Sequence, residues 1–433
     1  MTISMIHCGD IHLGFDQYNS EERFHDFHRS FLNIVDYAIE NRVDYFVIAG
    51  DFFNKRSINP RTLSQAIDGL NRLREKEIRV IAIEGNHDKA PYGQGDSWMD
   101  FLNQQEYFYL LNPRFEQGNL VLEPYEQKQG GSLVAFPGIR FVGLGYQGSM
   151  TARRLSELHE QLEKSEEITV LLLHSAVNNL LHLGGIKYED IALLKEKIDY
   201  VAMGHIHQRY ELDHWIYNPG SPECWDVGEG TKEKGFYHVA FADGKKNVTF
   251  VPSLKRPVHS LAVNVSGCEE LDEVYALCDE EVDKLDIKED SRPIVQLIIK
   301  GYTPFNPLAI DTKLLEEKIA TTLDCLIVEV VNNAVMKGSH HATSDGPEMN
   351  RDDLEREVLR GLFMEKGNLS PWVDELVDLS RNVKELILKE ADEQSVSALV
   401  ESLAEKIVAE DLVQDCEEQV AAAMESNDEG SEA

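Results

Sequence analysis

The sequence has 433 residues, of which 42% are hydrophobic, and its 42 Lys+Arg against 77 Asp+Glu give a formal net charge of −35 at pH 7. This length is enough for two or three domains with ordinary cores, and the composition is that of a soluble globular protein. The sequence does not begin with a basic segment followed by an apolar one, and no run of about 18 apolar residues occurs, so we expect neither secretion nor membrane insertion.

The acidity is concentrated in the C-terminal part of the chain. Residues 1–260 hold 27 basic against 36 acidic residues, whereas the remainder holds 15 against 41. Acidic chains bind phosphate backbones poorly, but the first part is only mildly acidic. It contains three basic clusters, at 54–61 ("NKRSINPR"), at Arg153-Arg154 and at Lys255-Arg256. Each cluster could meet a phosphate group or simply be solvated.

Residues 1–256 alternate short apolar runs with amphipathic patterns, which favours an α/β domain. Apolar runs predict strands at 3–8, 45–50, 80–85, 141–145, 169–174 and 199–204. Between them, apolar residues with a period of 3.6 predict helices at 21–40, 60–77 and 97–105. Short apolar pieces with Gly and Asp turns between 212 and 252 suggest an antiparallel meander.

A second pattern begins at residue 257. Residues 257–336 predict a compact β-α-β-α-β unit, 337–351 have the composition of a linker, and 352–410 have helical periodicity throughout. Residues 411–433 are expected to form an acidic disordered tail. The predicted organisation is therefore an α/β domain, a small α+β domain and a C-terminal helical extension.

Several predicted helices carry an apolar stripe whose partner the sequence does not identify. Within 352–410, three stripes that include Leu359, Leu379 and Val400 could pack on one another as a small bundle or dock on a partner protein. In the first domain, stripes within 63–70 and 98–102 could cover the sheet or pair two copies of the chain.

Polar side chains follow five of the predicted strands. Carboxyl ends of the strands in an open α/β sheet collect binding groups. So many polar groups would be costly to bury unpaired, and a shared metal centre would satisfy them together. The groups are Asp10 and His12 in "GDIH", Asp51 and Asn54 in "GDFFN", Asn86, His87 and Asp88 in "GNHD", His174 after "TVLLL", and His205 and His207 in "GHIH".

These residue types suit two divalent ions about 3.5–4 Å apart that share one bridging carboxylate. Asp51 follows a glycine at a strand end and is the best bridge. His87 then stays free of the ions and could stabilise a phosphoryl oxygen or protonate a leaving alkoxide. We assign Asp10, His12, Asp51 and His207 to one ion, and Asp51, Asn86, His174 and His205 to the other.

The ordered motifs resemble those of the calcineurin-like metallophosphoesterase superfamily, whose catalytic domain is a two-sheet α/β sandwich. More narrowly, "GDIHLGFD", "VIAIEGNHD" and "YVAMGHIHQ" followed by "IYNPGSPE" resemble the SbcD nuclease subunits and their counterparts in double-strand-break repair. The similarity covers residues 1–255 well and is mostly architectural beyond. It implies a nuclease domain at 1–256, a capping domain at 257–336 and a partner-binding helical region at 352–410.

The resemblance also implies an activity and partners. The expected activity is a manganese-dependent phosphodiesterase that acts on DNA as an exonuclease and endonuclease, at double-strand ends and hairpins. The expected cofactors are two divalent ions, Mn²⁺ first among them, although mixed nitrogen and oxygen ligands also suit iron or zinc. The expected assembly is a homodimer within a heterotetramer that contains an SbcC-type coiled-coil ATPase.

One departure from the family pattern concerns position 54, which often carries a carboxylate or an imidazole in related phosphoesterases and is Asn54 here. Its side chain could still hydrogen-bond His87, but it adds no charge. The resemblance therefore leaves the balance of exonuclease against endonuclease activity open.

Two other functions stay open at this point. The same scaffold could act on a phosphoester that is not DNA, or a decayed site could serve as an adaptor. The long C-terminal extension argues against a stand-alone enzyme for small molecules, and the presence of every inferred ligand argues against decay. Six scattered cysteines without a C-x-x-C pair are typical of reduced thiols, so we expect a cytoplasmic protein.

Overall fold

The computed structural model describes residues 2–91, 95–177, 185–285, 287 and 291–337, and in the C-terminal part 355–356, 359–360, 362–363, 372–388, 397 and 399–403. The chain divides into two units, Met1–Ala334 and Val335–Ala433. Each unit is described by itself below.

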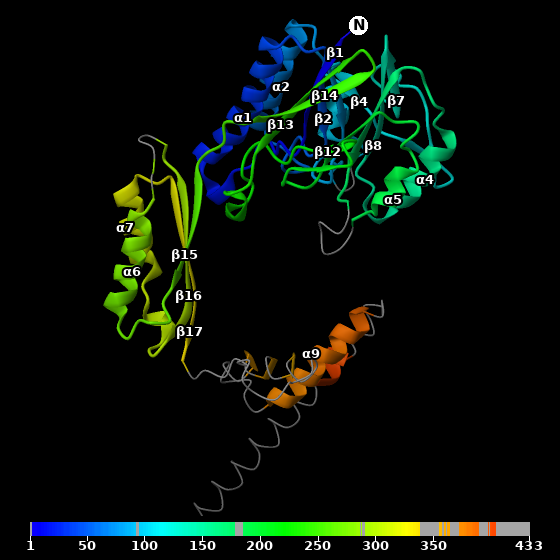
Figure 1. The fold of residues 1–433 in the computed structure, drawn as a ribbon. Helices are drawn as coiled ribbons and strands as arrows, with labels where there is room; N and C mark the ends of the chain where they lie inside the picture. Colours follow the sequence, from blue (N-terminus) through cyan, green and yellow to red (C-terminus); the bar gives the residue numbers. More distant parts are fainter. Residues whose placement is uncertain are drawn as a thin grey trace, which may run out of the picture. The chain divides into compact units, whose positions relative to one another are not determined.

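Two six-stranded sheets build the first 252 residues (Figure 1). The first has the order β14-β13-β1-β2-β3-β4, with β1–β2–β3–β4 parallel and β13 antiparallel to β1. Its strands are β1 (Ile3–Cys8), β2 (Tyr45–Ala49), β3 (Arg79–Ile83), β4 (Tyr109–Leu110), β13 (Gly235–Ala242) and β14 (Lys245–Pro252). The second has the order β11-β12-β10-β9-β8-β7. Its strands are β7 (Leu133–Phe136), β8 (Ile139–Gly145), β9 (Ile168–His174), β10 (Tyr200–Gly204), β11 (Tyr210–Leu212) and β12 (Ile216–Asn218).

Strand alternation explains how the sheets stack. In β2, Tyr45 and Val47 point into a core shared with the second sheet, whereas Phe46 and Ile48 point into a core under helices. Strand β10 does the same, since Ala202 faces the shared core and Met203 the opposite one. This domain is therefore layered helix, sheet, sheet, helix. The helices are α1 (Glu21–Glu40), α2 (Pro60–Glu75) and α3 (Trp98–Gln104) over the first sheet, and α4 (Thr151–Gln161) and α5 (Tyr188–Ala192) over the second.

The expected strands and helices of this domain are confirmed, but the meander at 212–252 is wrong in part. Strands β13 and β14 form an antiparallel hairpin as expected. Strand β12 instead lies in the second sheet, where it pairs parallel to β10. The chain between β12 and β13 crosses from one sheet to the other, so neighbouring strands in the sequence are not neighbours in space. An additional hairpin, β5 (Arg114–Glu116) with β6 (Asn119–Val121), lies outside both sheets.

The predicted β-α-β-α-β pattern is present as β15 (Val258–Asn264), α6 (Leu271–Asp283), β16 (Ile294–Thr303), α7 (Thr312–Leu323) and β17 (Ile327–Met336). Its strands form a separate sheet, β15-β16-β17, and α6 and α7 pack on one face around their own apolar core. At one end of this sheet Val258 and Ile294 pack against Val227 of the preceding domain. The boundary that we predict at residues 256 and 257 stays a prediction.

In the second unit, α9 (Val373–Leu388) is the described helix of the predicted helical region. Three ion pairs, Arg356 with Asp378, Arg360 with Asp374 and Lys384 with Glu355, join it to the segment around residue 360. The two segments therefore run antiparallel, because residues that come earlier in the first segment pair with residues that come later in α9. The predicted tail at 411–433, and all of the predicted linker at 337–351 except residue 337, lie outside the described residues.

Candidate metal centre

The polar side chains at the five strand ends lie together. Strands β1, β2 and β3 of the first sheet and β9 and β10 of the second all end at this edge. Asp10, His12, Asp51 and His174 are buried at the bottom of the site. The other candidate residues, Asn86, His87, His205 and His207, are only partly buried and form its accessible side.

The backbone at these strand ends is strained. Asp10, His12, Asp51 and His205 have positive φ values of 50°, 51°, 48° and 92°. Such values are uncommon for residues other than glycine, and they cluster at functional sites. The motif glycines are needed for close approach as well, because a Cβ on Gly85 would lie 2.0 Å from the Asp51 Oδ1 atom. The folded chain therefore holds the Asp51 carboxylate against the backbone of the "GNHD" loop.

Nitrogen and oxygen atoms in the site form three groups whose members lie within 4.8 Å of one another. The first matches part of the predicted first ion site, and the third matches part of the second. The middle group includes His87, which the sequence analysis leaves free of the ions. The groups are Asp10, His12 and His207; His12, Asp51 and His87; and Asp51, His174 and His205. Asn86 joins the third, since its Oδ1 lies 3.2 Å from His174 Nε2.

Charge is balanced inside the site between Asp51 and His174, whose Oδ2 and Nε2 atoms are 3.2 Å apart. Burial alone would raise the pKa of Asp51, but the charge and hydrogen bond of His174 outweigh it and hold the pKa well below its usual value. Burial would lower the pKa of His174, but the Asp51 charge outweighs it and raises the pKa to about 9. Burial lowers the pKa of His205 to about 4.

The donor set fits divalent ions. His12 and His207 bring their Nε2 atoms within 3.0 Å of each other, and the buried Nδ1 of His12 has no hydrogen-bond partner. Each neutral imidazole has one nitrogen without a proton, so this close pair of nitrogens can hold either a shared proton or a bound ion. Imidazole and carboxylate groups together suit manganese, iron or zinc. The residues therefore fit the metal centre that the motifs predict.

His87 is oriented by the backbone and not by the side chain that we expected. Its Nδ1 donates to the backbone carbonyl of Asn54 at 2.7 Å. The Asn54 side chain instead accepts a hydrogen bond from the indole N–H of Trp225 at 3.0 Å. The expected side-chain contact between Asn54 and His87 is therefore wrong. Any residue type at position 54 offers the same carbonyl, so the departure from the family pattern leaves the orienting acceptor of His87 in place.

Asp88 holds the two neighbouring loops together. Its carboxylate accepts backbone N–H bonds from Phe52, Phe53 and Gly85. Burial and the Asp51 charge raise the pKa of Asp88 to about 7. Asp88 therefore belongs to the support of the site, and its contacts explain why it follows His87 in the tetrapeptide.

The sequence analysis missed the residues that surround the ligands on one side. Glu229 Oε1 lies 2.9 Å from His207 Nδ1, and Lys234 and Trp225 contact the same carboxylate. They lie in the segment between β12 and β13, where no periodicity marks a position. Tyr146, after β8, has its ring centroid 5.5 Å from that of His205. The nearest motif, "IYNPGSPE", ends at Glu223, before Trp225, Glu229 and Lys234.

Two of the three basic clusters serve internal contacts. Arg154 and Arg153 pair with Glu157 on the same helix. Arg256 is buried and pairs with Asp26, and Lys255 donates to the Gly230 carbonyl at 2.6 Å. In the third cluster, Lys55 is exposed and pairs with Asp16. Arg153 and Lys55 are therefore both at the surface, and each is paired with an acidic neighbour.

Within the part of the chain that the structure describes, no helix has the length and apolarity needed to cross a membrane. The described cysteines, Cys8, Cys224, Cys268, Cys278 and Cys325, are buried free thiols, as the scattered positions predict.

Comparison with known proteins places this site in a family. Residues 3–209 match the calcineurin-like phosphoesterase family. The chain is 32% identical over 235 residues to the DNA double-strand break repair protein Mre11 of Archaeoglobus fulgidus, an alignment that covers 52% of this chain and 51% of that protein. It is 25% identical to the Mre11 protein of Saccharolobus solfataricus, with 75% of this chain and 85% of that one covered. The Mre11 protein of Haloferax volcanii is 27% identical, with 91% and 82% covered. Residues 3–209 are therefore a calcineurin-like metallophosphoesterase domain, in a chain related to the Mre11/SbcD-type proteins.

Proposed function

We propose that this protein is a metal-dependent phosphodiesterase that cleaves DNA during double-strand-break repair. The observation that carries the proposal is the convergence of two aspartates and five histidines from both sheets into overlapping groups of ligand atoms. The names of the archaeal relatives supply the substrate class. Exonuclease and endonuclease activity on double-strand ends and hairpins is the finer form of the proposal.

The roles of the residues follow from their positions. In this proposal Asp10, His12, Asp51 and His207 would hold one divalent ion, and Asp51, Asn86, His174 and His205 would hold the second, so that Asp51 would serve both. Bound ions supply Lewis-acid activation of water and of the phosphoryl group. Manganese is the proposed ion.

His87 binds the phosphodiester in this proposal. Its Nδ1 is committed to the Asn54 carbonyl, so Nε2 is the atom left for the substrate. In the imidazolium form that atom donates a hydrogen bond to a phosphoryl oxygen and can pass its proton to the leaving alkoxide.

The remaining parts of the chain have proposed roles in assembly. Residues 257–336 form the capping domain, and the helical region at 352–410 binds an SbcC-type ATPase. Helices α2 and α3 pair two copies of the chain. Most of their apolar side chains cover the first sheet, but Phe101 is 37% exposed and lies beside Trp98, which supports a further contact there. The complete assembly is a cytoplasmic heterotetramer.

The test is an activity panel with manganese. Wild-type protein and the Asp51→Ala variant are incubated with linear duplex DNA, with hairpin DNA and with bis-nitrophenyl phosphate. We expect the wild type to cleave all three and the variant none. Cleavage of the small ester alone would favour a phosphoesterase with another substrate. No cleavage by the wild type would favour the adaptor.

A further inference from the structure

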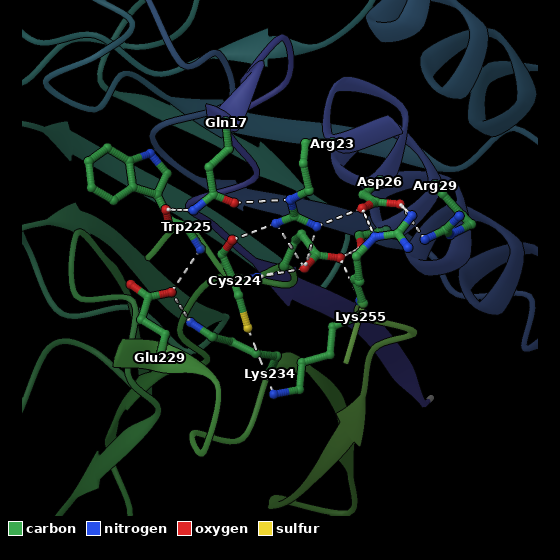
Figure 2. A network of polar contacts seen from close by, with 12 residues as sticks. Gln17, Arg23, Asp26, Arg29, Cys224, Trp225, Glu229, Lys234 and Lys255 are labelled. Atoms are coloured by element: carbon green, nitrogen blue, oxygen red, sulfur yellow. Dashed lines mark hydrogen bonds and ion pairs between the residues drawn. The ribbon is translucent and has the colours of Figure 1, made fainter. Parts of the chain in front are cut away.

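The segment of residues 219–234 joins the two sheets and contacts the Nδ1 side of one proposed metal ligand, His207. It contains a short 3-10 turn, η3 (Val227–Glu229), which none of the motifs includes. Glu229 projects from this turn and is four-fifths buried, with 18% of its side chain exposed. Figure 2 shows its carboxylate beside Lys234 and Trp225.

Both oxygens of Glu229 are used. Oε1 lies 2.9 Å from Nδ1 of His207, which donates because a carboxylate only accepts. Oε2 accepts from the Trp225 backbone N–H at 2.9 Å and from the Lys234 ammonium at 2.6 Å. These three donors leave both oxygens of Glu229 acting as acceptors.

Lys234 completes the support. Its side chain is fully buried, and its ammonium group donates to Glu229 Oε2, to the Ser221 hydroxyl at 2.7 Å and to the backbone carbonyl of His207 at 2.9 Å. Three donors thus meet three acceptors. The histidine is therefore held twice, at its ring through Glu229 and at its backbone through Lys234.

This double support fixes the direction of the remaining ring nitrogen. With Nδ1 bonded to Glu229, the unprotonated Nε2 of His207 points into the site and lies 3.0 Å from Nε2 of His12. Histidines that bind metals commonly donate their other N–H to a carboxylate, which selects the ligating tautomer and increases the basicity of the ligand.

The turn itself has little freedom. Val227, two residues before Glu229, is buried in an apolar cluster with Cys224, Val258 and Ile294. Asp226 accepts from the Gly228 N–H at 2.7 Å and begins the turn. The turn that carries Glu229 is therefore held in place, and the Glu229 carboxylate stays beside His207.

We propose that Glu229, backed by Lys234, is the positioning residue of His207 and sets the affinity of one of the two metal sites. The inference rests on the metal centre of the proposed function. Glu229 touches neither the substrate nor the ions. Its effect passes through the tautomer and orientation of the histidine.

The experiment is a calorimetric titration of the metal-free full-length chain with MnCl₂ at pH 7.5. We expect two sites in the wild type. Loss of an outer-shell partner costs typically 10–100-fold in metal affinity, so Glu229→Ala should weaken one site by that factor and leave the other unchanged. The weakened site should be the one that Asp10→Ala also weakens, because both residues serve the same ion.

Two further variants keep the result interpretable. Glu229→Gln preserves the shape and one acceptor oxygen, so it should fold if Glu229→Ala does not, and it should weaken the same site by a smaller factor. Glu233→Gln is the matched control, because its carboxylate lies in the same segment, is 67% exposed and pairs with Arg209. The control should titrate like the wild type.

Thermal unfolding in EDTA separates positioning from general damage. If Glu229 only positions His207, the metal-free unfolding midpoint of Glu229→Gln stays close to that of the wild type. The manganese affinity of one site falls nonetheless. Equal loss at both sites, or no loss at either, overturns the role of Glu229 and leaves the proposed function intact. A wild-type chain that takes up no manganese overturns both.

Discussion

At the scale of single residues, the proposed function assigns some groups of the site to the ions and others to the substrate. His87 is the residue whose role is least obvious from its position. It lies within ligand distance of His12 and Asp51, but its Nδ1 donates a hydrogen bond to the Asn54 carbonyl. Whether His87 binds an ion or the phosphodiester decides the chemistry of the site.

Replacement of His87 by alanine is expected to leave both ions bound and to lower phosphodiester cleavage. General acid–base groups contribute typically about 10² to 10⁴ in rate, so the loss should fall in that range. Metal content and cleavage rate are measured on the same preparation. A variant that loses one ion would show that His87 is a ligand and that our assignment is wrong.

Replacement of Asp51 by alanine is expected to abolish binding at both sites, because Asp51 belongs to two of the three ligand groups and is the proposed bridge. Asp10→Ala, by contrast, should weaken one site only. Titration with manganese counts the sites in each variant. Two intact sites in Asp51→Ala would rule the bridge out.

The ligand residues were predictable from the sequence for a simple geometric reason. Each follows a buried parallel strand directly, and parallel strands bring their carboxyl ends to one edge. Glu229, Lys234 and Trp225 were not predictable in this way. They lie in an irregular segment whose path depends on how the two sheets stack, and nothing in the local sequence encodes that.

At the scale of elements, helix α4 is attached to hairpin β5–β6 by several polar contacts, and the Glu157 carboxylate is the one that titrates. Glu157 Oε2 accepts the backbone N–H of Leu120 at 2.9 Å, and the carboxylate also pairs with Arg153 and Arg154. Burial alone would raise the pKa of Glu157, but these partners lower it to about 2. The charged form therefore favours the folded state.

The pH dependence follows from the sign of this shift. A carboxyl group with a lowered pKa in the folded state stabilises the protein above its unfolded pKa of about 4.3 and loses that contribution as the pH falls toward 2. Glu157→Gln should therefore cost about 1–2 kcal/mol at pH 7, and the difference from the wild type should shrink below pH 4. Urea unfolding across this range measures it, and a difference independent of pH would contradict the expectation.

The elements themselves were largely predictable, because β2 is an unbroken apolar run and α1 keeps the apolar period of a helix. Strand β12 was assigned to the wrong sheet because its three residues are too short to show a period. Its partner, β10, is fixed by contacts that are distant in the sequence.

At the scale of the whole molecule, the chain divides between Ala334 and Val335, close to the end of β17. The first unit contains every candidate metal ligand and its own apolar cores. A truncation after Lys337 keeps β17 complete and removes the helical region.

The truncated protein is expected to keep manganese-dependent cleavage within about threefold of the full chain, since folding units act independently when few contacts cross them. It should no longer co-purify with the ATPase subunit from the same genome. Unchanged binding of that subunit would place the docking surface in the first unit. Loss of cleavage with retained folding would show that the helical region acts on the catalytic site.

The candidate ligands come from both six-stranded sheets, so an ion bound there would add to the polar contacts that already join the two sheets at this edge, such as the pair of Asp51 with His174. A ligand that binds only the folded state, at a concentration one hundred times its Kd, stabilises that state by about 2.7 kcal/mol. Resistance to heat and to proteases should therefore rise and fall with the free metal concentration. In a cell short of metal, a protein with such a centre would lose its activity and would also be degraded faster, because less of it would be in the metal-stabilised folded state.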